Sequence, residues 1–196
     1  MSMTSPFCVK AVLLGILLTI MAYVHYMYTL VGCARELTHW ALWLTTLQIA
    51  ISFKCSLDTE IESKKGWLTA HHILFEIVTP MNLLVTTVYW SMLREVALAT
   101  YADTPTKVFH SSVIHSMPLV CNFVNFLVTD VVLCAQHGLM LTPIAIVYGY
   151  LNYQTTKARG YPVYHFLTWE DQTSFFIYGG LCLTTLCAFW GLAILT

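Results

Sequence analysis

The chain of 196 residues has few charged side chains, and this scarcity indicates the medium in which it folds. Asp, Glu, Lys and Arg together make up 10% of the sequence, whereas hydrophobic residues make up 58%. Soluble globular domains carry about 25% charged residues, so the composition predicts an integral membrane protein. The net charge of −1 and the lack of a basic stripe argue against a nucleic-acid partner.

The common motifs of soluble enzymes are also missing. No P-loop, G-x-G-x-x-G or G-x-S-x-G pattern occurs in the sequence, which removes the usual signatures of nucleotide binding and of α/β-hydrolases. The seven cysteines form no C-x-x-C pair or other metal-binding spacing. Neither a disulfide framework nor a zinc site is therefore expected, and the sequence predicts no metal or other cofactor.

Long apolar segments fill most of the chain. A membrane-spanning helix needs about 20 mostly apolar residues, and none of these segments has the polar and apolar alternation of barrel strands. We therefore expect an all-α fold, a single multi-pass bundle of six transmembrane helices with both termini on the same side. The expected spans are residues 9–30, 37–53, 67–93, 109–135, 139–153 and 174–196.

Two further features of these spans follow from the sequence. Pro80 is expected to interrupt the third span, and only residues 136–138 separate the fourth from the fifth, which predicts a tight turn. Lys and Arg number four on the side of the termini and five on the other side. This balance gives no orientation by the positive-inside rule.

Several polar side chains lie inside the apolar segments, where each needs a partner or a wet cavity. His115, Asn122 and Asn125 fall within one arc of the fourth segment at helical spacing. The two asparagines are typical of hydrogen-bonding links between membrane helices. The alternative is that they support a polar cavity around His115.

The third segment also carries polar residues. Glu76 lies one turn before Pro80, where it either satisfies the backbone groups that the proline frees or contributes to a functional polar cavity. His71 and His72 stand near the expected start of this span and are interpreted as interfacial residues.

Thr38 and His115 are expected to lie in the same half of the bilayer. The second and fourth segments both enter from the side opposite the termini, Thr38 in the first turn of one and His115 about two turns into the other. A hydroxyl beside an imidazole is the minimal pair for nucleophilic acyl transfer, because the imidazole removes the proton from an otherwise weak nucleophile. Taken alone, Thr38 is more typical of a helix N-cap.

The connection between the last two segments, residues 161–171, is rich in Tyr and Trp. Such residues concentrate at membrane interfaces, but the segment can also serve as a lid over a cavity on the Thr38 side. Thr168, followed by the acidic residues Glu170 and Asp171, is typical of a helix start at Thr168, because acids are favoured near the positive end of the helix dipole.

The segments RELTHWALWLTTLQIAISF at 35–53, HSMPLVCNFVN at 115–125 and GYPVY at 160–164 together resemble the FAR-17a/AIG1-like family. The resemblance implies a multi-pass membrane hydrolase of fatty acid esters of hydroxy fatty acids, in which a threonine and a histidine are essential. Those residues correspond to Thr38 and His115. Asn125 stands where the family has an acidic residue, and Ser112 stands where it has a second histidine.

Three functions are therefore compared. The first is an intramembrane lipid ester hydrolase that uses Thr38 and His115, with membrane lipids and an acyl-ester substrate as partners. The second is a non-catalytic accessory subunit of a larger membrane complex. The third is a haem-binding electron carrier, for which His72 and His115 would have to face each other. Of these three, we predict the hydrolase.

Overall fold

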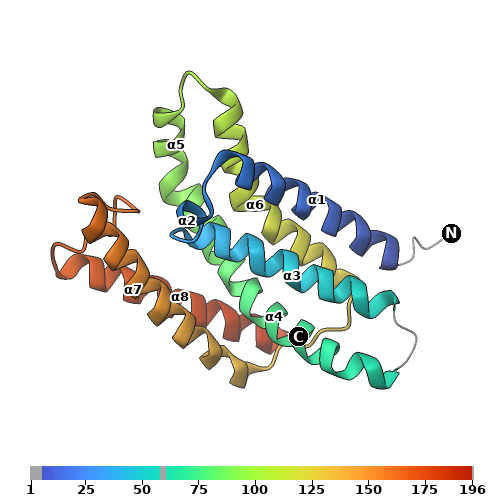
Figure 1. Ribbon diagram of the computed structural model, residues 1–196. Helices are drawn as coiled ribbons and strands as arrows, with labels where there is room; N and C mark the ends of the chain where they lie inside the picture. Colours follow the sequence, from blue (N-terminus) through green and yellow to red (C-terminus); the bar gives the residue numbers. More distant parts are fainter. Residues whose placement is uncertain (1–5, 58–60, 196) are drawn as a thin grey trace.

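The computed structural model describes residues 6–57 and 61–195, and every regular element in these ranges is helical. A π-helical turn η1 (Tyr89–Leu93) joins α4 to α5, and a 3-10 turn η2 (Ala135–Met140) precedes α7. The prediction of an all-α fold is confirmed. The α-helices are α1 (Pro6–Met27), α2 (Leu30–Cys33), α3 (Leu37–Leu57), α4 (Ile61–Val88), α5 (Arg94–Thr100), α6 (Pro105–Leu127), α7 (Leu141–Arg159) and α8 (Gln172–Leu195) (Figure 1).

Each predicted span contains a long helix, but two local expectations are wrong. The helix at the fourth span ends at Leu127, and the chain reaches α7 through residues 128–140 rather than through a tight turn. The last turn of α6 closes when the Val128 amide and the Thr129 hydroxyl both donate to the Asn125 carbonyl. Pro80 lies inside α4 without interrupting it. Residues 58–60, between the second and third predicted spans, and residue 196, at the end of the sixth, lie outside the described residues.

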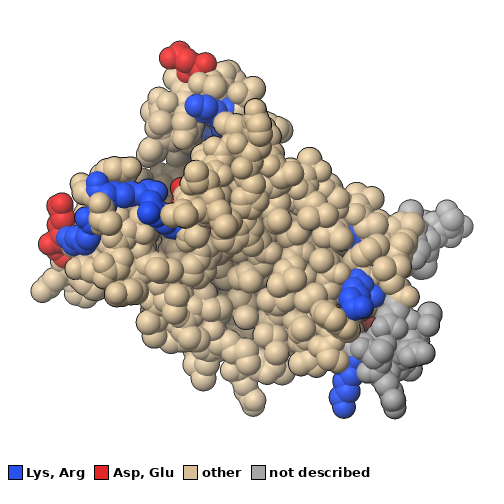
Figure 2. Space-filling view, in the orientation of Figure 1, with Lys and Arg blue, Asp and Glu red and all other residues tan. Residues whose placement is uncertain are grey.

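Three helical segments among the described residues are long and apolar enough to cross a membrane. They are Pro6–Met27, Lys65–Thr100 and Gln172–Leu195. In the last of these, only 6% of the most apolar stretch is buried within the protein, so its apolar side chains need another apolar environment. Figure 2 shows charged atoms at the margins of the visible face and a broad uncharged belt between them. These features are those of a membrane protein.

The helices form two packed groups (Figure 1). In the first, α1, α3, α4 and α6 make a bundle whose core includes Leu17, Ile49 and Cys121. In the second, α7 and α8 lie beside α4, where Phe75 and Phe189 pack together. The site described below lies between the two groups.

Buried polar side chains connect the helices of the first group. Gln48 on α3 lies 2.7 Å from the His71 imidazole on α4, and the Ser52 hydroxyl donates to the Asn125 Oδ1 at 3.2 Å. Asn122 on α6 donates to the Thr79 hydroxyl on α4 at 2.8 Å. Both asparagines thus link helices. His71 itself is buried between these helices, with only 4% of its side chain exposed.

Candidate functional site

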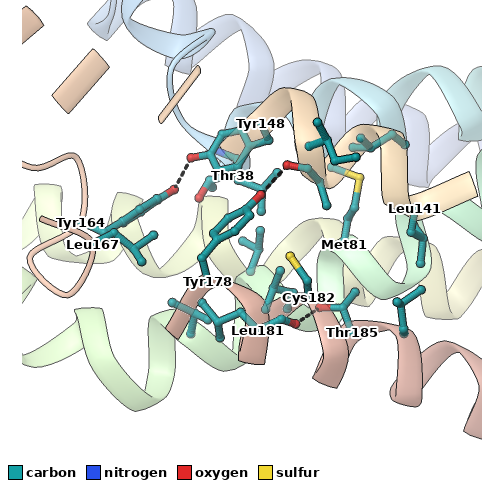
Figure 3. Close-up of a pocket in the computed structure, with 18 of the residues that line it drawn as sticks. Thr38, Met81, Leu141, Tyr148, Tyr164, Leu167, Tyr178, Leu181, Cys182 and Thr185 are labelled. Carbon is teal, nitrogen blue, oxygen red and sulfur yellow. Dashed lines mark hydrogen bonds between the residues drawn. The ribbon is translucent and has the colours of Figure 1, made fainter. Parts of the chain in front are cut away.

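A cavity of about 270 Å³ lies between the two helix groups (Figure 3). Thr38 and His115 both line it. Its wall is almost entirely apolar, with Met81, Leu84 and Val85 from α4 facing α7 and α8. The structure therefore brings the two residues of the predicted pair to one cavity, although they are far apart in the sequence. The remaining wall is formed by residues of η1, α7, α8 and the α7–α8 connection, among them Leu93, Ile144, Tyr148, Leu167, Tyr178 and Cys182.

Thr38 is the second residue of α3 and is 4% exposed. Two other threonines of this helix, Thr45 and Thr46, donate their hydroxyl protons to carbonyls four residues earlier, each at 2.7 Å. Thr38 makes no such side-chain bond to another described residue, since the residue four before it precedes the helix. Its hydroxyl group is therefore available at the cavity wall.

The His115 ring is fixed in orientation by two contacts. Its Nδ1 lies 2.7 Å from the Ser111 carbonyl oxygen, and because a carbonyl can only accept, Nδ1 of the neutral ring carries the proton. The lone pair then belongs to Nε2. The ring also stacks on Tyr89 with centroids 4.2 Å apart. Tyr89 begins the π-helical turn η1, a local irregularity of the kind often found at functional sites.

Tyrosine hydroxyls gather at the end of the cavity where α3 begins (Figure 3). The Leu37 amide donates to the Tyr148 hydroxyl at 3.1 Å, and this hydroxyl lies 3.1 Å from that of Tyr164. Burial of the Tyr164 hydroxyl, together with the nearby Tyr148, holds the pKa of Tyr164 well above its ordinary value. Tyr164 therefore stays a neutral phenol, and the network fixes the first turn of α3, which carries Thr38.

The connection between α7 and α8 covers this end of the cavity. Gly160 ends α7 with φ of +72°, a left-handed conformation that glycine adopts without steric cost. Tyr164, Phe166 and Leu167 then line the cavity, which fits the lid interpretation. The Trp169 indole anchors the segment by donating to the Asn152 side-chain oxygen at 2.7 Å. The helix start expected at Thr168 is wrong: α8 begins only at Gln172, and the acidic residues Glu170 and Asp171 precede it rather than lying in its first turn.

The other predicted site residues lie elsewhere. Asn122 and Asn125 make the interhelical bonds described above, and neither they nor Glu76 lines this cavity. Glu76 instead belongs to a separate cluster with His72 and His137. His72 and His115 line different hollows, so the structure does not bring together the histidine pair considered for haem.

Sequence reasoning missed Tyr148 and Tyr178. A signal for Tyr148 was present, because Tyr148, Asn152 and Thr156 follow one another at intervals of four residues and form a polar stripe on α7. All three are buried. The Tyr178 hydroxyl donates to the Ala145 carbonyl at 2.6 Å, a contact between α7 and α8 that no spacing along the chain reveals.

Comparisons of this chain with protein-family models, curated proteins and solved structures find no match. The functional conclusion therefore depends on the residues themselves and on the geometry given above.

Proposed function

We propose that this protein is an intramembrane hydrolase of acyl esters, of the FAR-17a/AIG1 type, built on six membrane spans. The observation that carries the proposal is the shared apolar cavity of Thr38 and His115. An available hydroxyl and an imidazole with an unprotonated Nε2 are the two groups that nucleophilic ester cleavage requires. The resemblance of residues 35–53 and 115–125 to that family points to the same pair.

The proposed reaction has two steps. In the first, the Thr38 Oγ attacks the ester carbonyl while the His115 Nε2 takes the hydroxyl proton, and the alcohol leaves with that proton. In the second, His115 takes a proton from a water molecule that attacks the acyl-threonine. This releases the fatty acid and restores both side chains.

The surroundings of Thr38 favour negative charge on the carbonyl oxygen. Thr38 lies in the first turn of α3, where the helix dipole and backbone amides present partial positive charge. The neutral Tyr164 hydroxyl and its neighbour Tyr148 lie at the same end of the cavity. In an apolar cavity such groups stabilise a developing oxyanion more strongly than they do in water.

The substrate class follows from the cavity wall. Leucine, isoleucine, valine, methionine, alanine and phenylalanine side chains make up most of it, so an acyl chain fits better than a polar substrate. Membrane lipids are the proposed neighbours of the bundle, and an acyl-ester lipid dissolved in the same leaflet would reach the cavity without first entering water.

The test is turnover of a long-chain acyl ester by the purified chain in detergent micelles. We expect hydrolysis in the wild type and none in Thr38→Ala or His115→Ala, with all three proteins retaining their helical circular dichroism spectrum. Hydrolysis that persists in purified Thr38→Ala would remove the proposed nucleophile. A wild-type chain without any turnover would favour the accessory-subunit function instead.

A further inference from the structure

A second polar cluster lies at a different place, where α4 meets η2. His72 and Glu76 are one turn apart on α4, and His137 comes from η2. The Glu76 Oε1 lies 3.1 Å from the His72 Nε2, and the Glu76 Oε2 lies 2.5 Å from the His137 Nδ1. All three ligand-type atoms lie within 4.8 Å of one another.

The charge of this cluster is not balanced by a permanent cation. Glu76 is 2% exposed, and its recorded ion pairs within the described residues are with histidines alone. A buried carboxylate is costly unless a positive charge or several hydrogen bonds compensate it. The Cys134 amide supplies one bond at 2.6 Å. The histidines supply positive charge only when they are protonated, whereas a divalent metal ion supplies it permanently.

The donor geometry also fits a metal. The His72 Nε2 is buried and makes no hydrogen bond, although it lies near the Glu76 carboxylate. The His137 Nδ1, in contrast, hydrogen-bonds to the Glu76 Oε2, so a metal ion bound between these atoms would replace that bond. Zn²⁺ takes two histidines and one carboxylate at about 2.0 to 2.2 Å, with donors about 3.3 Å apart. His72 and His137 are 36% and 35% exposed, so both can make the small adjustment required.

Neighbouring groups support this assignment. A ligand carboxylate is commonly held by a further hydrogen bond, which the Cys134 amide provides. His72 and His137 both line a hollow of about 360 Å³ together with Leu68, Ile73 and Met140. A fourth coordination position facing this hollow would be open to water or to another small ligand.

We propose that His72, Glu76 and His137 form a binding site for a divalent transition-metal ion of the zinc class. The ion would fasten η2 to α4. Because η2 also packs on α8, where the Trp190 indole donates to the Ala135 carbonyl at 3.0 Å, the metal would hold the α7–α8 pair against the bundle. This site shares no residue with the Thr38 cavity, so metal binding can be tested independently of ester hydrolysis.

The experiment measures zinc in the purified full chain. After removal of metal with EDTA, Zn²⁺ is titrated back while bound zinc is measured by mass spectrometry and stability by the melting temperature. We expect one zinc per chain and a rise in Tm of at least about 3 °C. Co²⁺ in place of Zn²⁺ should give the intense visible absorption of a tetrahedral site.

Single variants locate the site. His72→Ala and His137→Ala should each weaken zinc binding at least about 10-fold, whereas the control His165→Ala, in the exposed part of the α7–α8 connection, should not. The proposal is overturned if the wild type binds no zinc and gains no stability. It is equally overturned if both variants bind zinc as tightly as the wild type does.

Discussion

Replacement of Thr38 by valine removes the proposed nucleophile with almost no change in shape. The Thr38 hydroxyl bonds to no other described side chain or carbonyl, so a methyl group in its place leaves no described donor or acceptor unpaired. We therefore expect the free energy of unfolding to change by less than about 1 kcal/mol. Turnover, in contrast, should fall at least about 10³-fold, which corresponds to about 4 kcal/mol of activation free energy.

The assay is hydrolysis of a fluorogenic long-chain ester in detergent micelles, with the melting temperature measured on the same samples. Thr46→Val is the matched control, because Thr46 lies on the same helix and its buried hydroxyl donates only to the Leu42 carbonyl. That variant should lose about 1 kcal/mol of stability and keep its turnover. Thr38→Ser retains a hydroxyl and should keep turnover within about 100-fold. Ester turnover by Thr38→Val at the wild-type rate would exclude Thr38 as the nucleophile.

Further predictions concern the base, the lid and the packing of α7 on α8. His115→Gln should lower kcat by about 10² to 10⁴-fold with little change in KM, measured in the same ester assay; an unchanged kcat would exclude His115 as the base. Turnover should rise with pH as the His115 imidazole loses its proton. Because the pKa of Tyr164 is raised, turnover should then stay level to about pH 10. A decline from about pH 8 would contradict this. A Cβ at Gly149 would lie 2.8 Å from the Tyr178 ring, so Gly149→Ala should cost about 1 to 3 kcal/mol in thermal unfolding, and an unchanged Tm would argue against this contact.

The helices follow from the sequence because apolar length alone predicts them. Leu37–Leu57 and Gln172–Leu195 lie close to the predicted segments 37–53 and 174–196. The predicted fourth span extends beyond the end of α6, because the sequence stays apolar after Leu127. In the structure, hydrogen bonds to the Asn125 carbonyl end the helix. Hydropathy measures compatibility with lipid and does not show where hydrogen bonds end a helix.

The pair at the cavity was found from topology, whereas its neighbours were not. Thr38 and His115 enter from the same side in the predicted helix order, so the sequence could suggest that they line one cavity. Tyr148 and Tyr178 belong to helices whose rotation and tilt depend on tertiary packing, and the sequence does not specify either. The cluster of His72, Glu76 and His137 does not follow from spacing, because His137 is far from the other two in the sequence and reaches α4 only because residues 128–134 leave the helix.

We propose that the Thr38 hydroxyl attacks acyl esters with the help of His115. The most direct measurement is peptide mapping by mass spectrometry after the purified wild-type chain reacts with an organophosphonate ester probe. We expect a covalent adduct on Thr38 that is lost in His115→Gln and retained in Thr46→Val. A chain that hydrolyses ester and carries its adduct on another residue, or no adduct at Thr38, would contradict it.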